Sequence, residues 1–122
     1  MVDTTDSNKK FQKELNSGTA ALVLLSILAH ADKPMYGYRI AKFMDAGDEI
    51  APMMKQGALY PVLRSLESNE LLESYVDPSV SGPPRRYYKI TDSGLATLKS
   101  WIKIWDQTKT FVDGILKGKN DV

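Results

Sequence analysis

Two short segments of the chain contain cationic, amide and phenolic side chains of the types that bind nucleic acid. The first segment contributes Lys55, Gln56, Tyr60 and Arg64, and the second contributes Arg85, Arg86 and Lys89. In the major groove of DNA, arginine and lysine pair with guanine, and glutamine pairs with adenine. Lysine, arginine and tyrosine also bind phosphate oxygens. The two segments therefore predict contacts to the bases and the backbone of duplex DNA.

Both segments also have a purely structural interpretation. Tyr60 would pack locally and Arg64 would be a solvated charge, while the cations of residues 85–89 would protect a strand edge from aggregation. The net charge of +1 is low for a DNA-binding domain. Residues 78–104, however, contain five Lys or Arg and a single acid, Asp92. This local excess of positive charge favours the nucleic-acid interpretation.

A third candidate group comprises Tyr36, Tyr38 and Arg39 at the start of an expected helix. Helix N-termini attract anions, so this end could meet a phosphate. Alternatively, Tyr36 packs on the preceding helix. The sequence leaves the two interpretations open.

The sequence contains no set of residues typical of catalysis or of metal binding. It has no cysteine and one histidine, His30, which excludes disulfides and cysteine zinc sites. No nucleophile elbow or phosphate-binding loop is visible. We therefore expect neither an enzyme nor a cofactor.

The candidate residues lie on a predicted series of three helices, two strands and a long last helix, within one domain. Helices are expected at 19–31, 36–46 and 57–69, strands at 71–77 and 85–90, and the last helix at 92–117 after an N-cap at Thr91. Residues 1–17 are expected to be polar and partly helical, and 119–122 form a tail. The fold class is mainly α with a small β-hairpin, a winged helix-turn-helix (18–91) plus a long C-terminal dimerisation helix (92–118).

The last helix is longer than such a domain needs, and its wide apolar face requires a cover, for which a second copy of the chain is the simplest choice. The expected dimer interface comprises Leu22, Leu25, Leu98, Trp101, Ile102, Trp105, Val112 and Leu116. The longest apolar stretch, residues 20–29, is too short to span a bilayer. No membrane contact and a cytoplasmic location are expected.

Three motifs resemble those of the PadR family of transcription regulators. They are MYGYRIAK at 35–42, QGALYPVLRSLE at 56–67 and GPPRRYYKITDSG at 82–94. The resemblance covers residues 18–105 and implies a winged helix with one C-terminal dimerisation helix, as in the short subgroup of the family. It also implies binding to palindromic operators, usually as a repressor, with release by a small molecule in many members.

The sequence departs from the family pattern at three positions. Lys55 stands where serine is frequent, Ala58 where threonine is frequent and Glu70 where glycine is frequent. The first two changes remove hydroxyls from the start of the candidate recognition helix. The third is expected to alter the exit from that helix.

The tryptophans of the last helix have two interpretations. Both would pack in the dimer interface, where aromatic anchors are common. Alternatively, facing Trp105 rings would form a slot for a planar aromatic effector, because multidrug-sensing family members have a tryptophan at the matching position. The leading hypothesis is thus a homodimeric, ligand-responsive regulator that binds double-stranded DNA. The alternative is a winged-helix module that binds another protein.

Overall fold

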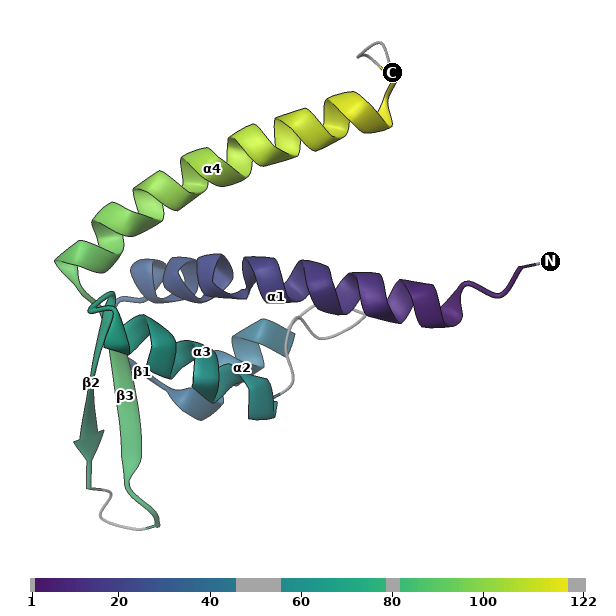
Figure 1. Ribbon diagram of the computed structural model, residues 1–122. Coiled ribbons are helices and arrows are strands. Elements are labelled where there is room, and N and C mark those ends of the chain that lie inside the picture. The colour runs from purple at the N-terminus through teal and green to yellow at the C-terminus, as the bar shows by residue number, and fades with distance from the viewer. Residues whose placement is uncertain (1, 46–55, 79–81, 119–122) are drawn as a thin grey trace.

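The computed structural model describes residues 2–45, 56–78 and 82–118 of the chain. Figure 1 shows the elements in chain order. They are α1 (Thr5–His30), β1 (Met35–Tyr36), α2 (Gly37–Asp45), α3 (Gln56–Ser68), β2 (Leu72–Asp77), β3 (Arg85–Ile90) and α4 (Asp92–Leu116). The order and the packing confirm the predicted fold class, a winged helix-turn-helix followed by a long helix. The predicted residue Lys55, the end of the predicted second helix at Ala46 and the predicted tail lie outside the described residues.

The sheet has three antiparallel strands in the order β1-β3-β2. Met35 pairs with Tyr88 and Tyr36 with Tyr87, so β1 adds a short strand to the outer edge of the predicted hairpin. The sequence placed Tyr36 in a helix because the apolar spacing after it suits a helix. In the structure α2 begins one residue later, at Gly37.

The core of the domain lies where α1 and α3 pack on the inner face of the sheet. Its members include Leu24, Leu28, Leu59, Leu63, Leu66 and Tyr88. Tyr88 is 3% exposed and belongs to this core. The outer face of the same strand carries Tyr87, and strand alternation explains the difference.

α1 is one continuous helix of 26 residues, so it begins at Thr5 rather than at the expected residue 19 and includes most of the segment expected to be partly helical. Figure 1 shows its first half extending beyond the domain, away from α2 and α3. Residues 9–16 are mostly good helix formers, and Gly18 alone does not end the helix. Phe11 and Leu15 lie exposed on this extension.

α3 ends in a Schellman motif in which Glu70 takes the left-handed conformation with φ +64°. Glu70 N donates to Glu67 O, and Leu71 N donates to Leu66 O, each at 2.9 Å. This pair of bonds defines the motif, whose left-handed residue is usually glycine. The departure from the family glycine therefore leaves the exit from α3 in its usual geometry, at a cost in backbone strain.

α4 begins directly after β3, and its N-terminus is fixed against the end of α3. The Thr91 hydroxyl accepts a hydrogen bond from Gly94 N at 2.9 Å and donates one to Glu70 O at 2.7 Å. A Cβ at Gly94 would collide with the carbonyl oxygen of Leu71. Only glycine permits this close approach, so α4 leaves the domain at a fixed angle and diverges from α1 (Figure 1).

Candidate nucleic-acid interface

α3 has one buried face and one exposed polar face. Leu59, Leu63 and Leu66 point into the core, while Tyr60 and Arg64 are exposed. The three leucines recur at the spacing of one helix face, which explains the opposition of the two faces. Gln56 is the first residue of the helix, and Pro61 lies within it. An exposed polar face on the helix that precedes the hairpin is where a winged helix-turn-helix reads the major groove.

Tyr60 also contacts the first turn of α2. A Cβ added to Gly37 would lie 2.8 Å from the Tyr60 hydroxyl oxygen and 2.9 Å from its ring. The ring thus packs on the glycine, as the structural interpretation expected, and its hydroxyl lies beside the N-terminus of α2. Tyr38 and Arg39 in that first turn are both exposed. The start of α2 and the exposed face of α3 are therefore close together and carry two tyrosines and two arginines.

The two arginines of the hairpin differ in their surroundings. The Arg86 guanidinium donates to the Ser74 hydroxyl at 2.9 Å, and that hydroxyl donates to the Glu67 carboxylate at 2.6 Å. Arg86 thereby connects both long strands to α3. Sequence reasoning missed Ser74 and Glu67, since their meeting depends on the register that pairs Ser74 with Tyr88.

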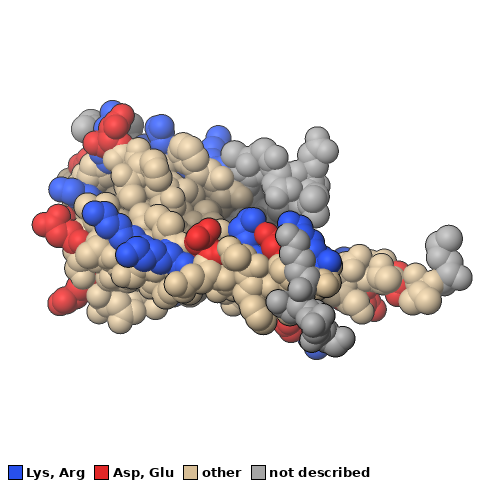
Figure 2. All heavy atoms as spheres, turned by 90° about the horizontal axis from the view of Figure 1, so that it is seen from above, with Lys and Arg blue, Asp and Glu red and all other residues tan. Residues whose placement is uncertain are grey.

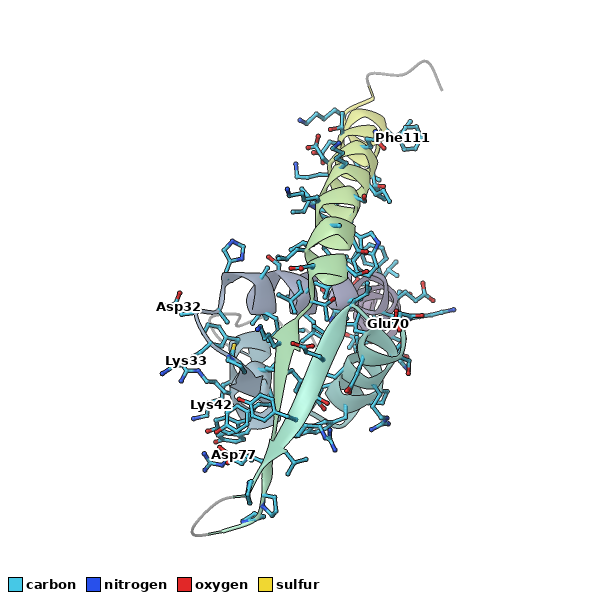
Figure 3. All side chains as sticks on the ribbon, turned by 90° about the vertical axis from the view of Figure 1, so that its left-hand side faces the viewer. Asp32, Lys33, Lys42, Glu70, Asp77 and Phe111 are labelled. Atoms are coloured by element: carbon cyan, nitrogen blue, oxygen red, sulfur yellow. The ribbon has the colours of Figure 1, made fainter. Side chains whose placement is uncertain are left out.

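Arg85 and Lys89 lie on the opposite, outer face of β3. Arg85 lies over the ring of Tyr36, with its Cζ 4.6 Å from the ring centroid. Both cations are exposed, and no ion pair involves either of them in the described part of the chain. Figure 3 shows Lys42 and Asp77 on one side of the hairpin, the side on which α2 lies.

A row of four tyrosines runs over the outer face of the sheet and onto the first turn of α2. Tyr36 and Tyr87 are cross-strand partners with ring centroids 5.6 Å apart, and Tyr75 stacks on Tyr87 at 5.6 Å. Tyr38 continues the row at 6.4 Å from Tyr36 and carries the Lys42 ammonium 5.0 Å from its centroid. The sequence did not predict this row, because β1 had been placed in a helix.

The other surface of interest is the apolar side of α4, whose distal half does not contact the domain. Trp105 is 42% exposed and Leu116 78% exposed, and Ile102 and Val112 are also exposed. Figure 3 shows Phe111 projecting from this helix into solvent. An apolar surface of this extent marks an interaction site.

Four of the eight residues predicted for the dimer interface are exposed, and the other four are not. Leu25, at 0% exposure, and Leu98, at 6%, belong to the core of the single chain, so their assignment to the interface is wrong. They were chosen because a helix that is apolar on most faces does not reveal which face is internal. Leu22 and Trp101 are half-buried beside that core.

Hollows lined by described residues open beside α1. One, of about 500 Å³, lies between α1 and α4 and is lined by Leu22, Trp101, Ile104 and Trp105 among others. A larger one, of about 970 Å³, lies beside the C-terminal half of α1 and is lined by His30, Tyr36, Arg39 and Phe43 among others. The sequence singled out Trp105 for a ligand slot but gave no sign of the second hollow.

Seen from above α4, positive and negative side chains are interspersed (Figure 2). The Lys109 ammonium lies 2.9 Å from the Asp113 carboxylate on this helix, and that hydrogen bond raises the pKa of Lys109. This side is therefore no uniform basic patch. In the described residues no cluster of three potential metal ligands occurs, and no helix there is long and apolar enough to cross a membrane.

The three helices, the antiparallel hairpin and the exposed face of α3 together define the winged-helix class of DNA-binding regulators. Within that class, residues 24–100 match the model of the transcriptional regulator PadR-like family. The chain belongs to this family, as its three motifs indicated. Members of the family are transcription regulators rather than enzymes.

Solved structures with the same fold support this assignment over most of the chain. A PadR family transcriptional regulator from Eggerthella lenta is 34% identical, with 97% of this chain and 96% of that one covered and a TM-score of 0.73. A PadR family regulator from Clostridium difficile is 31% identical, covering 80% and 98% at a TM-score of 0.66. An uncharacterized protein of Lysinibacillus sphaericus is 30% identical over 96 residues, 79% of this chain and 86% of that one.

Proposed function

We propose that the protein is a homodimeric transcriptional repressor that binds a palindromic operator and works in the cytoplasm. The observation that carries the proposal is the exposed polar face of α3, with Tyr60 and Arg64, next to a hairpin whose outer face presents Arg85 and Lys89. A helix of this kind enters the major groove, and a basic hairpin follows the adjacent backbone.

The proposed DNA-binding surface includes the ten residues predicted from the sequence. They are Tyr36, Tyr38, Arg39, Lys55, Gln56, Tyr60, Arg64, Arg85, Arg86 and Lys89. The contacts support different roles within this set. Arg64 and Arg85 are exposed cations without an ion-pair partner in the described residues. Tyr36 and Arg86 are engaged with other side chains of the protein.

Fluorescence anisotropy with labelled DNA from the promoter of the protein's own gene tests this function. We expect binding that is tighter than to a scrambled duplex by at least about a thousandfold and that weakens steeply as salt rises. Arg64→Ala should weaken binding to both duplexes. Binding that is equal for the two duplexes, or insensitive to salt, would instead indicate a module that recognises another protein.

The proposal includes an effector, a planar aromatic molecule bound beside Trp105. The half-exposed indole and the hollow of about 500 Å³ that it lines support this part. Aromatic rings stack on indole in apolar surroundings. We expect such compounds to bind the wild type and to bind Trp105→Ala much more weakly, as measured by isothermal titration calorimetry, because Trp101 lines the same hollow and its emission is no independent reference. Equal affinity for the two proteins would reject the Trp105 site.

A further inference from the structure

On the hairpin, the Arg85 side chain is held by an aromatic ring rather than by a hydrogen bond. Its guanidinium carbon lies 4.6 Å from the ring centroid of Tyr36. Arg86, one residue along, points to the inner face and donates to the Ser74 hydroxyl at 2.9 Å. The two arginines are adjacent in sequence, yet of the two only Arg85 has a guanidinium whose N–H groups make no hydrogen bond or ion pair with the described residues.

The ring beneath Arg85 is held from three strands. Tyr36 of β1 pairs with Tyr87 of β3, which in turn pairs with Tyr75 of β2. The Tyr75 and Tyr87 rings stack at 13° between their planes, and Tyr36 meets Tyr87 at 59°. Tyr36 and Tyr87 are half-buried. A ring fixed in this way is a stable platform, whereas an arginine on a hairpin edge would otherwise sample many rotamers.

Stacking engages the face of the guanidinium and leaves its N–H groups, which lie in the plane, available to an anion. Arginine binds phosphate through those same groups, in a bidentate geometry. Fixing the side chain before DNA arrives removes part of the ordering cost of binding. The Tyr36 ring thus orients a phosphate-binding group without competing with the phosphate.

We propose that Tyr36 is a positioning residue for DNA binding, whose ring holds Arg85 in the orientation that receives a backbone phosphate. The inference rests on the proposed function and deepens it. It assigns the Tyr36 side chain to Arg85, rather than to a DNA contact of its own. Its hydroxyl is not required, since the ring alone supplies the platform.

The test is a double-mutant cycle between Tyr36→Val and Arg85→Ala, read by anisotropy with operator DNA at several salt concentrations. Valine suits a strand. Tyr36→Val should weaken binding about fivefold to thirtyfold, since the Arg85 side chain of each of the two protomers must then be ordered on binding. In the Arg85→Ala background the same change should weaken binding less than about twofold. Tyr36→Phe should bind like the wild type.

Tyr75→Val is the matched control, because it removes a ring from the same row that carries no cation. Because Tyr75 supports Tyr36 only indirectly, through Tyr87, this change should weaken binding far less than Tyr36→Val does. Equal losses from Tyr36→Val in the wild-type background and in the Arg85→Ala background would overturn the proposal. A wild type that shows no salt-dependent binding to DNA would overturn the proposed function and this inference with it.

A measurement on the wild type decides the question even where Tyr36→Val does not fold. The ring current of Tyr36 should shift the δ protons of Arg85 upfield in the NMR spectrum of the free protein, and the shift should persist in Tyr36→Phe. Arg85 δ protons with the chemical shift of a freely rotating arginine would overturn the proposal that Tyr36 positions Arg85.

Discussion

At the scale of single residues, Glu70 is the described residue whose backbone conformation suits its residue type least. Its φ of +64° lies in the left-handed region, and Figure 3 shows the residue between the end of α3 and the start of β2. A side chain there costs about 1–2 kcal/mol relative to glycine. The left-handed conformation that the exit from α3 requires thus explains both the strain at Glu70 and the frequent glycine at this position in the family.

We therefore expect Glu70→Gly to raise the free energy of unfolding by about 0.5–1 kcal/mol, less than the full strain because glycine also gains entropy in the unfolded chain. Urea denaturation followed by circular dichroism measures this. Glu70→Asn, which tolerates the left-handed region, should fall between the two. A loss of stability in Glu70→Gly would mean that the Glu70 side chain itself stabilises the exit from α3.

The pKa of Tyr88 is raised above its usual value near 10, chiefly because burial disfavours the phenolate. The nearby Glu67 carboxylate adds to the rise, and Arg86 opposes it. The unfolded chain releases this proton near pH 10, and the folded chain does so only at higher pH. The contribution of Tyr88 to stability is therefore complete below pH 10 and is lost as the pH rises through the folded pKa.

Tyr88→Phe should abolish this part of the alkaline destabilisation. We expect its free energy of unfolding to decline less steeply above pH 10 than that of the wild type. Urea denaturation at pH 8 to 11 gives the two slopes. Tyr75→Phe, at an exposed ring, serves as the control and should follow the wild type. Parallel slopes for Tyr88→Phe and the wild type would show that Tyr88 ionises alike in the two states.

At the scale of elements, the connection from Arg86 through Ser74 to Glu67 holds the hairpin to α3. Arg86→Ala should lower stability by about 1 kcal/mol or less, since the bond is partly exposed. Because Arg86 is engaged within the protein, its loss should reduce the salt dependence of DNA binding less than the loss of Arg85. Thermal unfolding and salt titrations of the two variants provide the comparison.

Ser74→Ala separates the two roles of Arg86, because it breaks the connection and keeps the charge. It should reproduce the stability loss of Arg86→Ala. A salt dependence that falls equally in Arg85→Ala and Arg86→Ala would show that Arg86 also binds phosphate directly.

The elements themselves were largely predictable because their signals are local. The spacing of Leu59, Leu63 and Leu66 fixed the face of α3, and Thr91 marked the start of α4. β1 was not predictable in the same way, since two residues contain no period and their pairing with β3 depends on tertiary contact. The tyrosine row depends on that pairing and the Arg86 connection depends on the register of β2 on β3, so neither could be found from spacing alone.

At the scale of the whole molecule, α4 separates from the domain and carries apolar side chains that the chain does not cover (Figure 1). The length and the wide apolar face of this helix predict such uncovered side chains from the sequence. The sequence could not distinguish the apolar residues of the core, such as Leu25, from those that face outward, because a helix buried on most faces carries both kinds.

We expect Val112→Glu to shift the protein from dimer to monomer, since an unpaired carboxylate would be buried in the proposed interface. Val112 lies in the distal half of α4, outside the core of the single chain, so the domain should remain folded. Light scattering coupled to size exclusion gives the mass, and circular dichroism confirms the fold.

The same change should weaken operator binding by at least about a hundredfold. Two recognition helices about 34 Å apart must engage successive major grooves together, and a monomer loses the second engagement. Gln107→Glu adds the same charge on the opposite side of the helix and should leave both mass and affinity unchanged. A Val112→Glu monomer that binds the operator as tightly as the wild type would show that one chain suffices for recognition, and that the apolar side of α4 serves some purpose other than pairing two winged helices on DNA.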